Sequence, residues 1–291
     1  MRVLVGILAA GLAGCAQHSV STMSDSVDST NKIRVGYEQT EAIRFSPDDW
    51  PQDLYGDLYI PDYEGLKPAV LLVHGGGWEA RSRQDMNAQA RRAARQGFVV
   101  LNIDYRFAPE FPFPASLHDT QIAMHWLHDQ ADTLRIDPTR ISAIGFSSGA
   151  HLVSLMANVA GQGGELDRPY GGLTTRPHGV IIGGAPLDLL KFSGGRLVEQ
   201  YLGGTPLDIP EQYALASPQW HLHDNAPPHF LYHGRNDNLV PVEHSLDYAA
   251  ALASRNIEHE VYLMRWRGHA TAFITAQRAI DKGLAFLRRI P

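Results

Sequence analysis

The stretch that decides the fold, at residues 140–152, reads RISAIGFSSGAHL. Its first half is apolar and rich in β-branched residues from Ile141 to Phe146, which predicts a buried strand. Ser147 follows, with a glycine two residues away on either side, and the residues after it are compatible with a helix. Glycine permits a strand-to-helix turn so tight that other side chains near the serine would clash. The stretch therefore predicts a serine hydroxyl held clear of a sheet, at a helix N-terminus whose partial positive charge favours an anion.

The composition indicates one large domain. The chain has 291 residues, of which 44% are hydrophobic and 19% are charged. These values are typical of a globular protein with a sizeable core. The net charge of −6 gives no reason to expect a nucleic-acid partner, and the short basic clusters at residues 91–92 and 288–289 do not change that. We expect one α/β domain at residues 33–291 rather than two equal halves.

The N-terminus has the pattern of a signal peptide. Arg2 gives a positive start, residues 3–13 are apolar, and the run ends in Leu-Ala-Gly-Cys at residues 12–15. An apolar run of this length is too short to span a bilayer and predicts a signal peptide at residues 1–14. Residues 15–32 are polar after the cysteine and rich in Ser, Thr and Asp, so they predict a flexible tether.

The ending of this run resembles the bacterial lipobox. The resemblance implies that Cys15, the only cysteine of the chain, is lipidated and becomes the mature N-terminus. Residue 16 is Ala rather than Asp, which by the same resemblance implies sorting to the outer membrane of the cell envelope. An ordinary signal peptide with an incidental cysteine is the alternative.

Strand-like and helix-like stretches alternate from residue 69 to the end of the chain. Continuous apolar runs predict buried strands at 69–73, 98–103, 141–146, 179–184, 229–233 and 258–264, and helices are expected at 83–96, 117–134, 245–255 and 271–289. Earlier strand-like runs near 33–43 and 54–60 predict an antiparallel edge. The alternation predicts a mainly parallel, doubly wound sheet of about eight strands with helices on both faces. Residues 161–176 are expected to form a loop. Residues 186–227 lack a strong period and predict a partly helical excursion, a small cap, over the sheet.

Two loops supply the partners that a nucleophilic serine needs, namely a base and a group that orients the base. Asp237 lies just after the strand expected at 229–233, and His269 lies between the last strand and the closing helix. Because the carboxyl ends of parallel strands meet at one edge of a sheet, we expect Ser147, Asp237 and His269 to meet there. Asp119 and Asp224 are alternative acids, but neither follows a convincing strand.

A glycine loop is expected to supply the donors for a developing oxyanion. Residues 74–78 read HGGGW directly after the strand expected at 69–73. Consecutive glycines leave backbone N–H groups unobstructed by side chains. We expect the N–H groups of Gly75, Gly76 and Ser148 to bind the oxyanion.

The combined motifs resemble those of the α/β-hydrolase esterases. HGGGW at 74–78, DYRFAP at 104–109, GFSSGAH at 145–151 and HGRND at 233–237 carry the resemblance, which runs from about residue 67 to the end. The branch that the motifs resemble most is that of bacterial carboxylesterases similar to feruloyl and acetyl-xylan esterases and kynurenine formamidases. The sequence departs from relatives in two places. Ser148-Gly149-Ala150 stands where they commonly have Ala-Gly-Gly, and Phe146 stands where the hormone-sensitive-lipase branch favours Asp.

The resemblance implies a serine hydrolase that cleaves small carboxylic esters through an acyl-enzyme, with no cofactor. An amidase, formamidase or exopeptidase with the same three residues is one alternative, and a non-catalytic envelope lipoprotein that reuses the fold is another. The expected partners are a small ester substrate and, through Cys15, a membrane. The sequence does not indicate an oligomeric state, and the acyl and alcohol specificity depends on the loops at 161–176 and 186–227.

Other residues near these motifs have both structural and functional interpretations. Asp104 and Arg106 are expected to contribute a buried ion pair that braces the glycine loop rather than to bind substrate. Trp78 is either a wall of the acyl pocket or core packing, and His151 is expected to be structural. The histidines at 221, 223, 229 and 233 lack the spacing of a zinc site, so we expect no metal.

Overall fold

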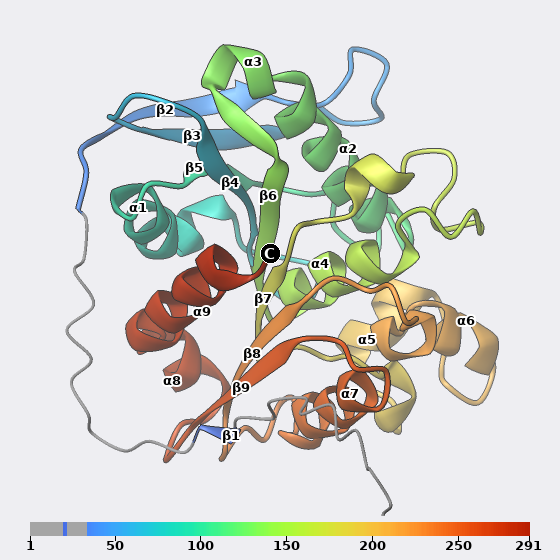
Figure 1. Cartoon of the computed structure of the whole chain (residues 1–291). Coiled ribbons are helices and arrows are strands. Elements are labelled where there is room, and N and C mark those ends of the chain that lie inside the picture. The colour runs from blue at the N-terminus through green and yellow to red at the C-terminus, as the bar shows by residue number, and fades with distance from the viewer. Residues whose placement is uncertain (1–19, 22–33) are drawn as a thin grey trace, which may run out of the picture.

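The computed structural model describes residues 20–21 and 34–291. Their strands form one nine-stranded sheet in the order β1-β9-β8-β7-β6-β4-β5-β3-β2 (Figure 1). The strands are β1 (Val20–Ser21), β2 (Tyr37–Arg44), β3 (Tyr55–Pro61), β4 (Lys67–Val73), β5 (Val99–Ile103), β6 (Ile136–Phe146), β7 (Val180–Gly183), β8 (His229–Gly234) and β9 (His259–Met264). The expectation of about eight strands is met by β2 to β9, and β1 adds two residues at one edge.

The sheet is mainly parallel, as predicted. β4 pairs in parallel with β5 and β6, and each later pair through β8 and β9 is also parallel. Only β2 with β3 and β3 with β5 run antiparallel among the pairs of the described strands. This confirms the antiparallel edge that the sequence predicts near residues 33–60.

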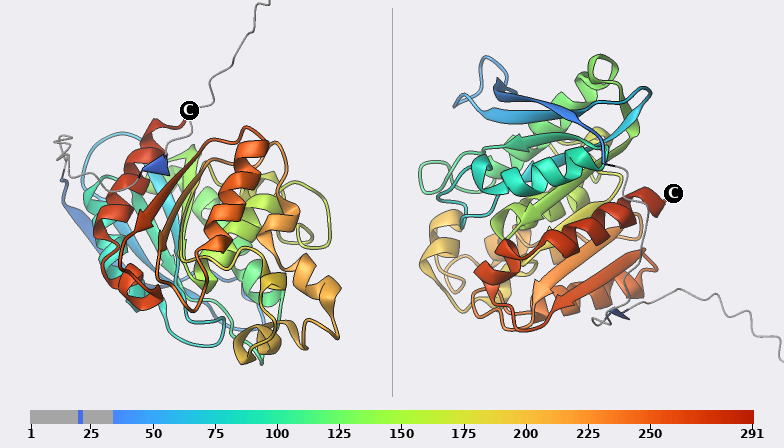
Figure 2. Two further views of the ribbon diagram at one scale, coloured as in Figure 1. Left: turned by 90° about the horizontal axis from the view of Figure 1, so that it is seen from below. Right: turned by 90° about the vertical axis from the view of Figure 1, so that its left-hand side faces the viewer.

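Helices cover both faces of the sheet (Figure 2). They are α1 (Asn87–Arg95), α2 (Ala115–Asp129), α3 (Ala131–Leu134), α4 (Ser148–Val159), α5 (Arg196–Leu202), α6 (Pro210–Leu215), α7 (Glu243–Ser254), α8 (His269–Ile274) and α9 (Gln277–Arg289), with short 3₁₀ turns η1 (Arg83–Met86), η2 (Leu173–Thr175), η3 (Leu189–Lys191) and η4 (Pro218–His221). Adjacent residues of β4 pack on opposite faces of the sheet, and because helices cover both faces, the strand needs a continuous apolar run. Leu71 and Val73 join the buried cluster of α2 and α4, whereas Val70 and Leu72 join that of α1 and α9.

The helices depart from the sequence prediction in two places. The helix expected at 117–134 is divided into α2 and α3 around Gln130, and the closing helix expected at 271–289 begins at His269 and is divided between α8 and α9. Neither break contains the glycine or proline that usually marks a helix end, so the sequence carried no stop signal there. The expected loop at 161–176 contains the turn η2.

Residues 186–227, which the sequence predicts to be a partly helical excursion, are called the excursion segment here. They hold η3, α5, α6 and η4. The rings of Trp78 and Tyr201 stack at 4.5 Å, which places α5 on the loop that follows β4.

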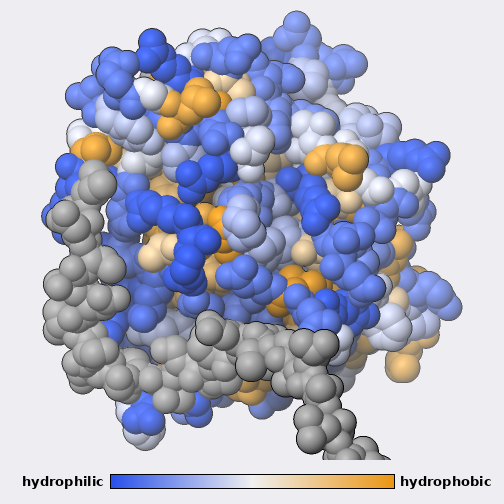
Figure 3. Space-filling view, viewed as in Figure 1, coloured by the Kyte–Doolittle hydropathy of each residue, from blue (hydrophilic) through white to orange (hydrophobic). Residues whose placement is uncertain are grey.

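The described residues were compared with the predicted membrane anchor for apolar surface and for membrane-spanning helices. One face is mainly hydrophilic, with apolar residues in small groups (Figure 3). No helix within residues 34–291 is long and apolar enough to cross a membrane. The predicted signal peptide at 1–14 and Cys15 lie outside the described residues.

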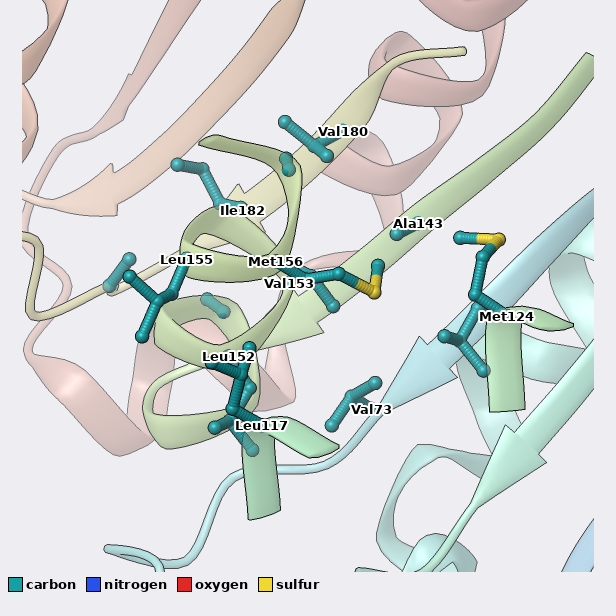
Figure 4. Close-up of a cluster of buried hydrophobic side chains, with 14 of the residues drawn as sticks. Val73, Leu117, Met124, Ala143, Leu152, Val153, Leu155, Met156, Val180 and Ile182 are labelled. Carbon is teal, nitrogen blue, oxygen red and sulfur yellow. The ribbon is translucent and has the colours of Figure 1, made fainter. Parts of the chain in front are cut away.

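The helix α4 is the central element of the core on one face. All of its residues are buried. Leu152 and Met156 of α4 lie among Val73 and Ala143 of the sheet and Leu117 of α2 (Figure 4). Truncating one such side chain to alanine costs about 2–5 kcal/mol. The turn at Ser147 therefore leads into a helix that the core holds firmly.

Candidate active site

Ser147 lies in a strained turn between β6 and α4. Its backbone has φ 53° and ψ −123°, in the left-handed half of conformational space that non-glycine residues rarely adopt. A Cβ at Gly145 would lie 2.4 Å from the carbonyl oxygen of Gly149, and one at Gly149 would lie 2.2 Å from that of Val73. Both positions therefore accept only glycine, which is the physical reason for the spacing in the sequence.

The glycine loop after β4 lies against this turn. A Cβ at Gly75 would be 3.1 Å from the Cβ of Ser147. Among the described residues, no backbone acceptor pairs with the N–H of Gly75 or Gly76. The N–H of Ser148 belongs to the first turn of α4, where helix geometry provides no partner. Of the three predicted oxyanion donors, Gly75 and Ser148 thus lie beside Ser147, and Gly76 follows Gly75 in the same loop.

A chain of two hydrogen bonds joins Ser147 to Asp237 through His269. His269 Nε2 lies 2.9 Å from Ser147 Oγ, and His269 Nδ1 lies 2.7 Å from Asp237 Oδ2. Because a carboxylate only accepts, Nδ1 carries a proton and Nε2 can accept the proton of the serine hydroxyl. The structure brings the three residues together from the carboxyl ends of β6, β8 and β9, as their order in the sequence predicts.

The carboxylate of Asp237 is buried and surrounded by donors. Oδ1 accepts from the N–H groups of Leu239 and Val240 at 3.0 and 2.9 Å, and Oδ2 also faces His233 Nε2 at 3.3 Å. Burial raises the pKa of Asp237, but the hydrogen bonds from His233, His269 and Val240 outweigh it and hold this pKa well below its ordinary value. The group that orients His269 therefore stays ionised at neutral pH.

The imidazole of His269 is confined on its other sides. The ring of Phe146 lies 4.9 Å from it, measured between centroids. A Cβ at Gly184, which has φ 53°, would be 3.1 Å from His269 Cε1. Phe146 and Gly184 thus limit how far the base can move from Ser147.

The similarity to known proteins covers most of this arrangement. The family model BD-FAE matches residues 56–252, from β3 into α7, which is more than half of the chain. The matched stretch includes Ser147 and Asp237, and His269 lies beyond it. The chain belongs to the BD-FAE family.

Curated relatives of this BD-FAE chain carry esterase names. "Probable carboxylic ester hydrolase LipM" of Mycobacterium tuberculosis is 26% identical over 233 residues, which are 77% of this chain and 54% of LipM. Esterase LipC of the same organism is 30% identical over 206 residues, which are 67% of this chain and 51% of LipC. The chain thus spans about half the length of these relatives.

Solved structures confirm the predicted α/β-hydrolase fold. A truncated carbohydrate esterase from gut microbiota superposes with a TM-score of 0.76 at 21% identity, covering 89% of this chain and 97% of that one. Butyrate-bound esterase 2 of Thermogutta terrifontis superposes with a TM-score of 0.71 at 24% identity, covering 86% and 94% of the two chains.

The interpretation of Asp104 and Arg106 needs correction in this BD-FAE chain. Each forms an ion pair, but they have separate partners. Arg106 pairs with the buried Asp119 at 2.7 Å, and Asp104 pairs with Arg83. Asp119, an alternative acid in the sequence, also accepts from the indole of Trp50, whereas His269 pairs with Asp237. Burial raises its pKa, although the hydrogen bonds from Arg106 oppose this.

Trp78 and His151 pack in the interior. Trp78 is 3% exposed and donates from Nε1 to His151 Nδ1 at 3.2 Å, and His151 Nε2 donates to the carbonyl of Ala216 at 2.7 Å. Burial lowers the pKa of His151 to about 4, so the ring stays neutral. The packing interpretation of Trp78 and the structural interpretation of His151 are confirmed, and the pair ties the glycine loop to α4 and the excursion segment.

The histidine-rich stretch is explained by separate hydrogen bonds. His221 bonds to the carbonyl of Leu215, and His229 bonds to that of Pro227 and to Tyr248. Within the described part of the chain, no group of three or more His, Cys, Asp or Glu side chains is arranged to hold a metal ion.

His233 is the residue that the sequence interpretation missed. The sequence gives it no role beyond its place in the HGRND motif and in the histidine-rich stretch, yet its Nε2 faces the carboxylate of Asp237 at 3.3 Å. The spacing of four residues between them was a possible signal, but it becomes a contact only because the chain turns back after β8.

Proposed function

We propose that the chain is a serine hydrolase that cleaves small carboxylic esters through an acyl-enzyme. The observation that carries the proposal is the hydrogen-bonded chain from Ser147 through His269 to Asp237, at 2.9 and 2.7 Å. Ser147 is the nucleophile and His269 is the general base. Asp237 orients the imidazole and stabilises its protonated form. The esterase names of the relatives support the same chemistry.

The first half of the reaction forms the acyl-enzyme. His269 Nε2 takes the hydroxyl proton while Ser147 Oγ attacks the ester carbonyl carbon. The N–H groups of Gly75, Gly76 and Ser148 then stabilise the negative oxygen, each worth about 3–4 kcal/mol in such transition states. The bond to the alcohol oxygen breaks, and His269 gives that oxygen its proton.

The second half repeats these steps with water. His269 takes a proton from the water, whose oxygen attacks the acyl carbon. The bond to Ser147 Oγ breaks, and the serine recovers its proton from His269. The acid is released, and the side chains are restored.

The test replaces each of two adjacent serines. Ser147→Ala removes the nucleophile, so we expect turnover of a short-chain p-nitrophenyl ester to fall by at least about 10⁴-fold with the thermal unfolding temperature retained. Ser148→Ala is the matched control, because it keeps the backbone N–H that the proposal uses. We expect a fluorophosphonate probe to label the Ser148→Ala protein but not the Ser147→Ala protein.

The outcomes separate this proposal from the alternatives. Undiminished turnover in Ser147→Ala would remove that serine from its role. Failure of the probe to label the unmodified chain would favour a non-catalytic protein with this fold. A substrate panel in which amides react faster than the matching esters would favour the amidase alternative.

We also propose that Cys15 is lipidated and anchors the chain to the outer membrane of a bacterial envelope. The support is the resemblance of residues 12–15 to the lipobox. Stable anchoring needs more than one acyl chain, which lipoprotein modification supplies. Labelling with a fatty-acid analogue should occur in the unmodified chain and disappear in Cys15→Ser. Labelling that persists in this variant would contradict the assignment.

A further inference from the structure

The loop between β9 and α8 presents a tryptophan to solvent. Residues 265–267 read Arg-Trp-Arg and lie at the lower left of Figure 1, just before His269. The side chain of Trp266 is 83% exposed, and its backbone has φ 58°. An indole in this position contributes nothing to the core, and its left-handed backbone is disfavoured for a bulky residue. Exposed tryptophan and arginine together are typical of binding surfaces.

Hydrogen bonds hold this loop in place. The N–H groups of Arg235 and Asn236 donate to the carbonyls of Met264 and Arg267 at 3.0 and 2.9 Å. Arg267 Nε donates to Thr275 Oγ1 at 3.0 Å, which ties the loop to the end of α8. The indole is therefore presented by an ordered loop, and a ligand would not have to pay for ordering it.

Two hollows lie beside Trp266, and arginines line both. One has a volume of about 440 Å³ and is lined by Tyr262, Met264, Arg265, Trp266, Arg267, Thr275 and Arg278. The other, of about 220 Å³, is lined by Arg235, Asn236, Arg265 and Trp266. The larger volume falls within the range of about 300–1,000 Å³ that is typical of small-ligand sites.

The charge of this surface is opposite to that of the chain. Its two hollows are lined by four arginines and, among the described residues, by no Asp or Glu, although the chain carries a net charge of −6. No ion pair joins Arg235 or Arg265 to an acidic side chain of the described part of the protein. Arg235 and Arg265 can therefore pair with an anion without giving up an ion pair within the described residues, and the surplus of guanidinium groups attracts anions.

The side chains define the chemistry of the ligand. A guanidinium pairs in a planar, bidentate way with a carboxylate, and the face of an indole packs on a ring. A polymer of rings that carry carboxylates at intervals offers both groups. A flat bilayer fits less well, because the surface is hollowed and Trp266 is the one exposed large apolar side chain among the residues that line the two hollows.

We propose that Trp266, with Arg235, Arg265 and Arg278, binds an acidic polysaccharide beside the candidate active site. Arg235 lies two residues before Asp237 and Trp266 lies three residues before His269, so a bound polymer is held close to the groups proposed to cleave esters. The binding goes beyond the proposed hydrolysis, because it does not require Ser147.

The test measures binding to polygalacturonate by affinity electrophoresis, with neutral xylan as the comparison polymer. We expect the unmodified chain to bind polygalacturonate and to bind it less well as salt rises, since salt screens exposed charges. Trp266→Ala and the double variant Arg235→Gln with Arg265→Gln should each weaken binding by about tenfold or more. Trp220→Ala and Arg168→Gln are the matched controls, because they remove an exposed indole and an exposed guanidinium elsewhere and should leave binding unchanged.

Other measurements make the proposal falsifiable. Turnover of a small p-nitrophenyl ester should stay within about twofold in the Trp266 and arginine variants, because these residues do not touch the reacting atoms. Loss of this turnover together with unchanged binding would overturn the proposal. Equal binding of neutral xylan, or vesicles with anionic headgroups bound more tightly than polygalacturonate, would also overturn it.

Discussion

The serine side and the acid side of the site are held by different physical means. Ser147 sits in left-handed backbone between two glycines whose Cα atoms lie against backbone carbonyl groups. Asp237 is held by hydrogen bonds to both of its carboxylate oxygens. The first arrangement depends on the absence of side chains, and the second depends on donors that are present.

This difference implies that the two sides respond differently to substitution. An added methyl group at Gly145 or Gly149 meets backbone atoms of α4 or of the end of β4, which cannot move without disturbing the core. Removing one donor near Asp237 leaves the others in place, so the loss is graded. Substitutions on the serine side should therefore cause a large loss of stability and activity at once, whereas those on the acid side should cause smaller, graded losses.

Gly149→Ala should have the largest effect. Its Cβ would lie 2.2 and 2.3 Å from the carbonyl oxygens of Val73 and His74. We expect the free energy of unfolding to fall by more than about 4 kcal/mol, and ester turnover to be lost with it. Denaturant unfolding and a p-nitrophenyl ester assay measure the two losses.

Gly164→Ala is the matched control for this prediction. A Cβ at Gly164 meets no atom within 4 Å, so its effect should stay within about 0.5 kcal/mol. Equal stability of the two variants would show that the turn at Ser147 is not sterically fixed.

The serine side could be predicted from the sequence because its steric constraint leaves a local pattern of glycines. The glycines at 145 and 149 flank one serine at a visible spacing, and the run of glycines in HGGGW at 74–78 can be recognised on its own. The order of the strands then indicated where Asp237 and His269 lie, since the carboxyl ends of parallel strands meet at one edge. The two hydrogen bonds of the structure follow that order.

The surroundings of the acid could not be predicted in the same way. His233 faces Asp237 because the chain turns back after β8, and no local pattern encodes that turn. The partners of Arg106 and Asp104 are likewise chosen by tertiary packing, since Asp119 comes from α2 and Arg83 from η1. The excursion segment lacks a strong period, so its contact with Trp78 is visible only in the structure.

Asp237→Asn should have the next largest effect, a fall in kcat of about 10⁴-fold with the fold intact. The amide keeps an oxygen for the N–H groups of Leu239 and Val240 but turns its own N–H toward His269 Nδ1. The imidazole would then carry its proton on Nε2 and could not accept the proton of Ser147.

The control for this substitution is Asp224→Asn. Asp224 is the exposed alternative acid, whose cationic partner is Arg255 at 4.0 Å, and its replacement should leave kcat unchanged. A fall of less than about tenfold in Asp237→Asn would contradict the role given to this carboxylate.

His233→Phe should have the smallest effect on turnover. The size of this effect should depend on pH. His233 Nε2 lies 2.8 Å from the carbonyl of Val240, which only accepts, so this nitrogen carries a proton and also faces Asp237 Oδ2 at 3.3 Å. Ser245 Oγ lies 2.7 Å from the other ring nitrogen. A hydrogen bond to a charged group contributes about 1.5–3 kcal/mol, and the long distance places this one at the low end.

The sign of the pH effect follows from the lowered pKa of Asp237. A carboxyl whose pKa is lower in the folded state contributes stability above its unfolded pKa, and this contribution is lost as pH falls toward the folded value. Loss of the His233 donor raises the folded pKa, so acid inactivation and acid unfolding should begin at a higher pH. His233→Gln, which keeps an N–H donor, should restore part of the shift.

The pH profile of kcat/KM separates this effect from simple destabilisation. His229→Phe is the matched control, because His229 is equally buried at the other end of β8 and bonds to the carbonyl of Pro227 and to Tyr248, far along the strand from Asp237. We expect both variants to lose stability at neutral pH, and only His233→Phe to move the acid limb of the profile upward. Equal movement in the two variants would mean that the acid side, like the serine side, depends on packing rather than on its donors.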